Sequence, residues 1–274
     1  MSLPALTGCI AAGAGGPAPC YSGDWIEGTG LPSGLATYAL NFDGTNDYVS
    51  FGAANSASSN ALQPSAGTYA FWVKRDNTAY AVTFGAGPTG GSSASNADYG
   101  PSIYVNWPPV SGGKIMFNLG TGTKYAYKIT NATLTTGVWA HLAMSWAAAY
   151  SATTDHKVYI NGVEQSGDLF AQSDTDTTGW SPVGDKANRR VVLGARTNSA
   201  YYFNGAIAQV GVWDSVLGAS DITSLQTALP SAVASSDLVA YYDMSDGGGS
   251  STLTDKTANG YDGTLTNMDV GTAC

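Results

Sequence analysis

Short runs in which apolar residues recur at every second position, separated by turn-forming residues, restrict the fold of this chain more than any other feature. Tyr69, Phe71 and Val73 alternate in this way, and the residues from Val138 to Trp146 repeat the pattern. Alternating residues line one face of a pleated strand. Many short strands at this spacing predict an all-β fold, an antiparallel β-sandwich. The runs are TYALNF, DYVSF, TYAFWVK, AYAVTF, SIYVNW, KIMFNL, KYAYKI, VWAHLAMSW, HKVYING, RVVLG and AIAQVGVWD.

The composition agrees with a single large domain of this kind. The chain has 274 residues, of which only 11% are charged, while Gly (35), Tyr (16) and Trp (7) are plentiful. This balance is typical of short strands joined by small-residue loops. One short helix is predicted in SDITSLQTAL, where Ser220 can cap the helix and Ile222, Leu225 and Leu229 share a face.

The charge pattern argues against two classes of partner. The formal net charge is −9, and the few Lys and Arg residues are scattered apart from Arg189-Arg190, so no basic stripe is available to neutralise a nucleic-acid backbone. No run of apolar residues approaches the ~18 that a membrane span requires. We therefore expect neither a nucleic-acid partner nor a membrane span.

Residues 1–36 are so rich in Gly, Ala and Pro that they predict an extended N-terminal arm, with the sandwich domain over residues 37–274. Such a segment has little apolar surface to offset its own ordering. If it is ordered, we expect it to contact other subunits of a homo-oligomer or a virion. The alternatives are a Cys9–Cys20 bridge, or packing of Trp25 and Ile26 on the chain's own domain.

The start of the arm contains Leu6-Thr7-Gly8-Cys9, which resembles a bacterial lipobox. Only MSLPA precedes it, with neither a basic nor an apolar region, so we interpret the match as chance and find no recognisable signal peptide.

The stretch ALNFDGTNDYVSFG, residues 39–52, concentrates two aspartates and an asparagine between two apolar runs. Counted from Asp43, it lacks the Gly at the sixth position and the Glu at the twelfth that an EF-hand calcium loop needs. Asp, Asn and Gly tolerate turn dihedrals. The sequence therefore predicts a β-hairpin closed by Asp-Gly-Thr-Asn-Asp.

This stretch also begins a series of segments that resembles the laminin-G-like and pentraxin-like branch of the concanavalin A-like lectin/glucanase superfamily. The series continues with TYAFWVK, VWAHLAMSW, KVYINGV and VVLGARTNSAYYFNGAIAQVGVWDSVLGASDI, in the order that the family uses. The segment 238–267 is similar to a strand-and-turn unit that completes such domains. The resemblance implies a jelly-roll sandwich. Its members mostly bind glycans, glycosaminoglycans or proteins, often with calcium, and some are glycoside hydrolases.

The catalytic branch of that superfamily carries Glu-x-Asp-x-x-Glu on one strand, and nothing here matches it. The chain has only two glutamates, Glu27 in the arm and Glu164 after Asn161-Gly162. Glycoside hydrolysis normally needs two carboxyl groups that face the bond, so we expect that this protein is not an enzyme. His141 and His156 lie in strand runs, where roles in packing are favoured over catalysis.

The resemblance also implies a place for calcium. The pentraxin-like pattern takes ligands from the loop before SIYVNW, where Asn96 and Asp98 lie, and from the segment after Leu-Gly, where this chain has Arg196-Thr197-Asn198. An arginine there would repel a cation, so the two-ion site is disfavoured. A single Ca²⁺ held by Asn96, Asp98, Asn198 and carbonyls is the remaining metal hypothesis. Alternatively, Asn96 and Asp98 only stabilise a turn.

Loop aromatics supply a second route to recognition, because sugar rings pack on Trp and Tyr. The candidate ligand-binding residues are Tyr99, Trp107, Trp180, Tyr201 and Tyr202, whereas Trp72, Trp139, Trp146 and Trp213 lie in strand patterns and are core candidates.

The sequence thus predicts a non-catalytic recognition or adhesion module for a glycan or a glycosylated surface, located outside the cell, at the cell surface or on a virion. The chief alternative is a structural or decoration protein of a larger assembly such as a virion, and a glycoside hydrolase is third.

Overall fold

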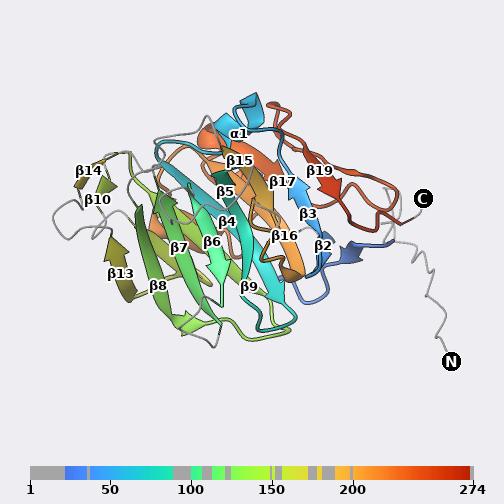
Figure 1. Ribbon diagram of the computed structural model, residues 1–274, viewed down its shortest axis with the longest axis horizontal. Helices are drawn as coiled ribbons and strands as arrows, with labels where there is room; N and C mark the ends of the chain where they lie inside the picture. Colours follow the sequence, from blue (N-terminus) through green and yellow to red (C-terminus); the bar gives the residue numbers. More distant parts are fainter. Residues whose placement is uncertain are drawn as a thin grey trace.

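The computed structural model describes residues 22–35, 38–88, 100–106, 113–120, 125–148, 150–151, 156–171, 178–180, 189–197 and 200–271. Two large antiparallel sheets pack face to face, and only short helices accompany them (Figure 1). The predicted all-β antiparallel sandwich is therefore confirmed.

One sheet has eight described strands, and the first strand of the described chain lies at one of its edges. The order is β1 (Trp25–Glu27), β2 (Tyr38–Asp43), β16 (Asn204–Trp213), β4 (Gly67–Arg75), β9 (Ala140–Trp146), β11 (Lys157–Ile160) and β12 (Val163–Glu164), with β17 (Leu238–Tyr242) paired to β16.

The other sheet has nine strands and faces the viewer in Figure 1. Its order is β13 (Gly167–Ala171), β8 (Tyr125–Thr133), β7 (Lys114–Gly120), β6 (Ser102–Val105), β5 (Ala81–Pro88), β15 (Arg189–Leu193), β3 (Tyr48–Ser50), β19 (Gly263–Thr266) and β18 (Thr252–Leu253). A separate pair joins β10 (Tyr150–Ser151) to β14 (Thr178–Trp180).

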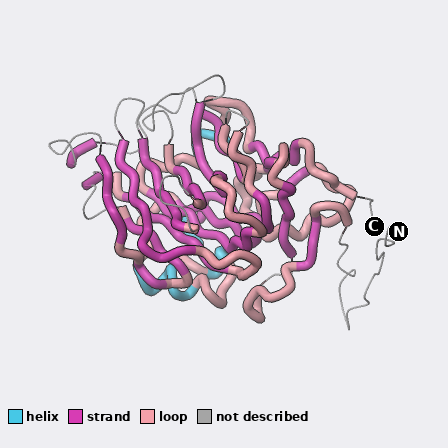
Figure 2. Tube along the Cα trace, turned by 60° about the horizontal axis from the view of Figure 1, so that its bottom comes forward, coloured by secondary structure: helices cyan, strands magenta, loops and turns pink. Residues whose placement is uncertain are grey.

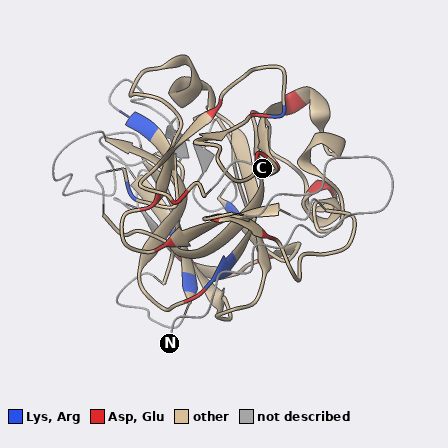
Figure 3. Cartoon of the chain, turned by 90° about the vertical axis from the view of Figure 1, so that its right-hand side faces the viewer, with Lys and Arg blue, Asp and Glu red and all other residues tan. Residues whose placement is uncertain are grey.

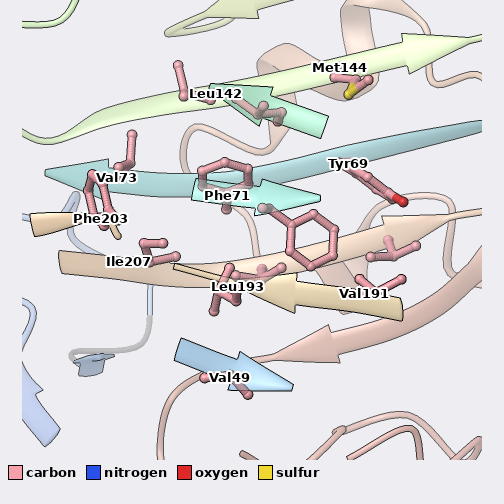
Figure 4. Packing of buried hydrophobic residues seen from close by; sticks show 14 of the residues in the cluster. Val49, Tyr69, Phe71, Val73, Leu142, Met144, Val191, Leu193, Phe203 and Ile207 are labelled. Carbon is pink, nitrogen blue, oxygen red and sulfur yellow. The ribbon is translucent and has the colours of Figure 1, made fainter. Parts of the chain in front are cut away.

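The core lies between the two sheets and is built from the alternating positions of the strands. Tyr69, Phe71 and Val73 of β4 share it with Val191 and Leu193 of β15, and Figure 4 shows these side chains pointing into the same space. All of the predicted strand runs form strands, and β17 to β19 of the segment 238–267 add to both sheets. The predicted inward face of β4 is thus confirmed.

The predicted tryptophan core is confirmed for Trp72, Trp146 and Trp213, which are buried. Trp139 is only half-buried, because it lies at the margin of the eight-stranded sheet, where its indole Nε1 donates to the carbonyl of Thr29 at 3.1 Å.

The predicted hairpin at residues 39–52 is wrong, because β2 belongs to the eight-stranded sheet and β3 to the nine-stranded sheet. The turn between them crosses from one sheet to the other. Asp43 accepts hydrogen bonds from the amides of Thr45 (2.6 Å) and Asn46 (3.3 Å), and Asp47 accepts one from the amide of Asp43 (2.8 Å). These bonds replace the ladder that a hairpin would have formed at this point.

The outer face of the eight-stranded sheet is covered by other segments of the same chain. Helix α2 (Ala219–Ser224) and the short helices η2 (Pro230–Ala232) and η3 (Ser235–Asp237) lie in the segment that packs over Trp213. Figure 2 shows helices along the lower side of the strands. A second patch around Trp72 is covered by residues 26–35. This face is therefore closed by apolar contacts.

The predicted helix exists but begins earlier than expected. Gly218, not Ser220, is the N-cap residue, and Asp221 accepts a hydrogen bond from the Gly218 amide at 3.3 Å. Ile222 and Leu225 are buried as predicted, whereas Leu229 follows the helix and packs near Trp72. A further helix, α1 (Ala57–Ala61), was not predicted, since its residues are small and polar.

Part of the predicted arm belongs to the sandwich. Trp25 is 1% exposed and lies in the main core, and β1 pairs with β2. The amide of Asp24 donates to the carbonyl of Asp269 at 2.7 Å, and the amide of Asp269 donates to the Asp24 carboxylate at 2.7 Å. Among the described residues, β1 is thus the first strand of the sandwich, and it buries a tryptophan within a Gly-rich segment. Residues 1–21, with Cys9 and Cys20, lie outside the described residues.

Candidate functional site

The outer face of the nine-stranded sheet is aromatic, and strand alternation explains why. Ile103 and Val105 of β6 point into the core, so Tyr104 between them points outward. Ala126 of β8 likewise points inward, so Tyr125 and Tyr127 point outward. The strands that build the core therefore also present tyrosines on the opposite face.

These tyrosines form a connected group, which we call the tyrosine cluster: Tyr80, Tyr104, Tyr125, Tyr127 and Tyr201. The rings of Tyr80 and Tyr104 are stacked with centroids 5.8 Å apart, and Tyr80 lies 4.5 Å from Tyr201. Tyr125 and Tyr127 stack at 5.8 Å. Tyr80 and Tyr127 both pack on an apolar group formed by Val82, Tyr104, Met116 and Ile129. The cluster thus crosses the sheet from β5 to β8.

Tyr201 is the exposed member of the cluster, with 42% of its surface exposed. It lies in the loop between β15 and β16, and its carbonyl accepts a hydrogen bond from the amide of Val82 at 3.0 Å, which ties the loop to β5. Its φ is 55°, in the left-handed region that a bulky side chain rarely adopts. Such strain in a well-held loop is typical of positions where the orientation of a side chain matters.

Two arginines make cation–π contacts with tyrosines of this region, and one of them contacts the tyrosine cluster. Arg190 of β15 precedes the inward-pointing Val191 and therefore points outward. Its guanidinium carbon is 5.6 Å from the ring centroid of Tyr48. The guanidinium carbon of Arg196 is 5.3 Å from the ring centroid of Tyr201. Cation–π contacts of this kind hold a guanidinium group in a defined orientation.

The sequence-predicted ligand-binding residues divide into three groups. Tyr201 lies in the tyrosine cluster, and Tyr202 is half-buried next to it. Trp180 belongs to β14, for which only the backbone is described. Tyr99 and Trp107 lie outside the described residues. Tyr80, Tyr104, Tyr125 and Tyr127 were missed because they lie within or next to strand runs, although alternation in those runs identifies them as outward-pointing.

The predicted calcium ligands Asn96, Asp98 and Asn198 also lie outside the described residues, so the calcium site stays a prediction. Within the described ranges, no three His, Cys, Asp or Glu side chains lie together in a way that could hold a metal ion. No helix among the same residues is long and apolar enough to cross a membrane.

The two glutamates of the chain lie far apart. Glu27 lies in β1 and Glu164 in β12, at opposite edges of the eight-stranded sheet. Figure 3 shows acidic positions scattered over several loops and strand ends. The two glutamates therefore cannot face the same glycosidic bond.

Both histidines are buried and neutral. Burial lowers the pKa of His141 to about 3, and burial together with the nearby charge of Lys128 lowers the pKa of His156 to about 3. The Nδ1 atom of His141 is hydrogen-bonded to Nε2 of Gln226 at 2.8 Å. The predicted packing roles agree with this burial.

Comparisons with known proteins agree with the fold. The family model of the concanavalin A-like lectin/glucanases superfamily matches residues 43–223. The rat protein "Sushi, von Willebrand factor type A, EGF and pentraxin domain-containing protein 1" is 29% identical over 123 residues, which are 44% of this chain and 3% of that protein.

Among solved structures, a protein of Bacteroides ovatus assigned to carbohydrate binding has a TM-score of 0.54 and 17% identity, covering 84% of this chain and 58% of the other. The CBM40 domain of the Ruminococcus gnavus IT-sialidase, solved with α2,3-sialyllactose, has a TM-score of 0.50 and 14% identity, covering 69% of this chain and 96% of the domain.

The chain spans a small fraction of the rat protein and a little over half of the Bacteroides protein. At these identities the structural likeness shows the fold alone. The family model, however, matches more than half of the chain, and the series of strands that carries the match forms the two sheets described above. The chain belongs to the concanavalin A-like lectin/glucanase superfamily.

Proposed function

We propose that the chain is a non-catalytic recognition module that binds a glycan or a glycosylated surface through the outer face of the nine-stranded sheet. The tyrosine cluster with its exposed, strained Tyr201 is the observation that carries this proposal. Tyrosine rings pack on the apolar C–H faces of sugars, while neighbouring polar groups bind the hydroxyls. The carbohydrate-binding neighbours of the fold support the same class of ligand.

The choice between the two outer faces follows from what covers them. Described segments of the chain close the outer face of the eight-stranded sheet with buried apolar contacts. On the nine-stranded sheet, Tyr104 is buried with Val82, Met116 and Ile129, but Tyr201 is exposed and Tyr80, Tyr125 and Tyr127 are half-buried. A ligand that needs aromatic surface therefore finds it at these four tyrosines rather than on the outer face of the eight-stranded sheet.

The separation of Glu27 from Glu164 supports a role without catalysis. A module of this kind acts outside the cell, at a cell surface or on a virion, where glycans are displayed. A structural role in a larger assembly, with residues 1–36 in contact with other subunits, is a separate prediction. Most of these residues lie outside the described ranges.

Replacing Tyr201 by alanine is expected to weaken glycan binding about tenfold, the loss typical of one stacking side chain in a recognition site. Binding is first surveyed on a glycan array. The affinity for the glycan that binds most tightly is then measured by calorimetry with the wild type and with Tyr201→Ala. Tyr261→Ala is the matched control, because Tyr261 is half-buried and lies in the turn before β19. The same incubations are assayed for new reducing ends.

Three results would count against the proposal. If the folded protein binds no glycan on the array, the recognition role is wrong. Equal losses from Tyr201→Ala and Tyr261→Ala would place the site elsewhere. Release of reducing ends that an Asp substitution abolishes would make the protein an enzyme.

A further inference from the structure

Arg190 is held in place by contacts that leave part of its guanidinium group unused. Its Nε and Nη2 atoms both donate to the carbonyl of Thr197, at 3.2 and 2.6 Å, and Tyr48 packs against it. Among the described residues no carboxylate pairs with Arg190, and its Nη1 atom makes no hydrogen bond. An arginine fixed in this way has N–H groups oriented for an anion.

The loop that anchors Arg190 also carries Arg196. The amide of Arg196 donates to the carbonyl of Ala200 at 2.9 Å, and the amide of Phe203 donates to the carbonyl of Gly194 at 2.8 Å. These two hydrogen bonds close the loop on itself. Thr197, the anchor of Arg190, directly follows Arg196. One loop therefore links the two arginines: its Thr197 carbonyl holds Arg190, and its Arg196 lies beside the exposed ring of Tyr201.

Among the described residues, two arginines lie in this part of the outer face, although the whole protein carries a net charge of −9. Asp168 lies outward on the same sheet, but it belongs to the edge strand β13, five strands from β15 in the sheet order. At a strand spacing of about 4.8 Å this separation is roughly 24 Å, beyond the range of a direct ion pair.

We infer that the outer face binds glycans that carry an anionic substituent, a carboxylate or a sulfate, and that Arg190 and Arg196 hold this substituent while Tyr201 packs on a sugar ring. The inference rests on the proposed glycan-binding function and names the class of glycan. Guanidinium groups donate paired hydrogen bonds to carboxylate and sulfate oxygens. These charge-assisted bonds are stronger than hydrogen bonds to the neutral hydroxyls of a sugar.

The test uses pairs of polysaccharides that differ only in charge. Polygalacturonate is compared with its fully methyl-esterified form, and dextran sulfate with dextran, so the two pairs separate carboxylate from sulfate. We expect the anionic member of at least one pair to bind ten times more tightly or better. Arg190→Gln and Arg196→Gln should each reduce that preference about tenfold, the effect of one charge-assisted hydrogen bond.

Lys157→Gln is the matched control, since it removes the same charge from β11 in the other sheet. It should change binding less than twofold, and thermal unfolding checks that each variant is folded. Arg190→Lys keeps the charge but not the geometry, and it should restore little of the preference.

The outcomes separate this inference from the proposed function. Equal binding of both members of each pair, or a preference that Lys157→Gln reduces as much as Arg190→Gln, overturns the inference while the proposed function stands. The same holds if the array yields only neutral glycans. If EDTA abolishes binding and Arg190→Gln does not, calcium rather than arginine holds the ligand, as the Asn96, Asp98 and Asn198 prediction requires. Absence of any glycan ligand overturns both.

Discussion

Replacing Asp255 by alanine should lower the free energy of unfolding by about 4 kcal/mol, because buried donors lose a charged acceptor. Asp255 is 5% exposed. Its Oδ1 accepts from the amides of Tyr241 (3.1 Å) and Thr257 (2.9 Å). Its Oδ2 accepts from the amide of Tyr261 (3.0 Å) and the hydroxyl of Thr257 (2.9 Å). One carboxylate thus joins β17 to the turn that leads to β19.

Urea unfolding at pH 7 measures the change. Asp255→Asn should lose about half as much, because its amide keeps one acceptor oxygen but turns an NH2 group toward two donors. Asp76→Ala, at an exposed position with no side-chain hydrogen bond among the described residues, should stay within about 0.5 kcal/mol of wild type. A loss below about 1 kcal/mol for Asp255→Ala would show that water replaces the carboxylate and that the junction is not held by it.

Replacing Asp47 by asparagine should stabilise the protein at neutral pH, by up to about 3 kcal/mol. Burial of Asp47 raises its pKa to about 6, and repulsion from Asp43 and Asp24 adds to this, although the hydrogen bond from the amide of Asp43 opposes it. The side chain is 3% exposed and lies in the turn that crosses between the sheets. Asparagine resembles the protonated acid and can keep the bond from Asp43.

The direction of the pH effect follows from the raised pKa. Between pH 3.8, the ordinary value for Asp, and about 6, the folded protein holds the Asp47 proton while the unfolded chain has lost it. Stability from this group is therefore present at low pH and falls as the pH rises through 6. The unfolding free energies of wild type and Asp47→Asn should be similar at pH 4 and differ most above pH 7. A difference independent of pH would contradict the assignment.

The strands were predictable because each has a buried face that sets a period of two, and that period is visible without tertiary information. The turn after β2 was not predictable in the same way. The local chemistry of Asp43 and Asp47 fits a hairpin and an inter-sheet connection equally well, and only the partners β16 and β15 decide between them. Packing of Trp25 on the chain's own domain was only an alternative prediction for a related reason: its strand is three residues long and its core contacts come from distant segments.

The site was only partly predictable. Tyr201 was a candidate because it lies in a loop among polar residues, whereas Tyr104 was hidden in a run whose neighbours Ile103 and Val105 form core. Sequence can assign such residues to opposite faces, but it does not show which outer face of a sandwich other segments will cover. The packing of Leu217, Ile222 and Val233 over one sheet, which settles that question, depends on how the chain returns after β16.

The contact between Asp24 and Asp269 brings the two ends of the described chain to one point at the edge of the sandwich. A domain whose entry and exit lie side by side can be spliced into a loop of a host protein without forcing that loop apart. Under mechanical load the same arrangement directs a pull on the two ends to the three-residue β1 and its few bonds, which would peel away first. The tyrosines of β6 and β8 lie in the other sheet, so a tethered module of this design would stay attached to its ligand while its base begins to yield.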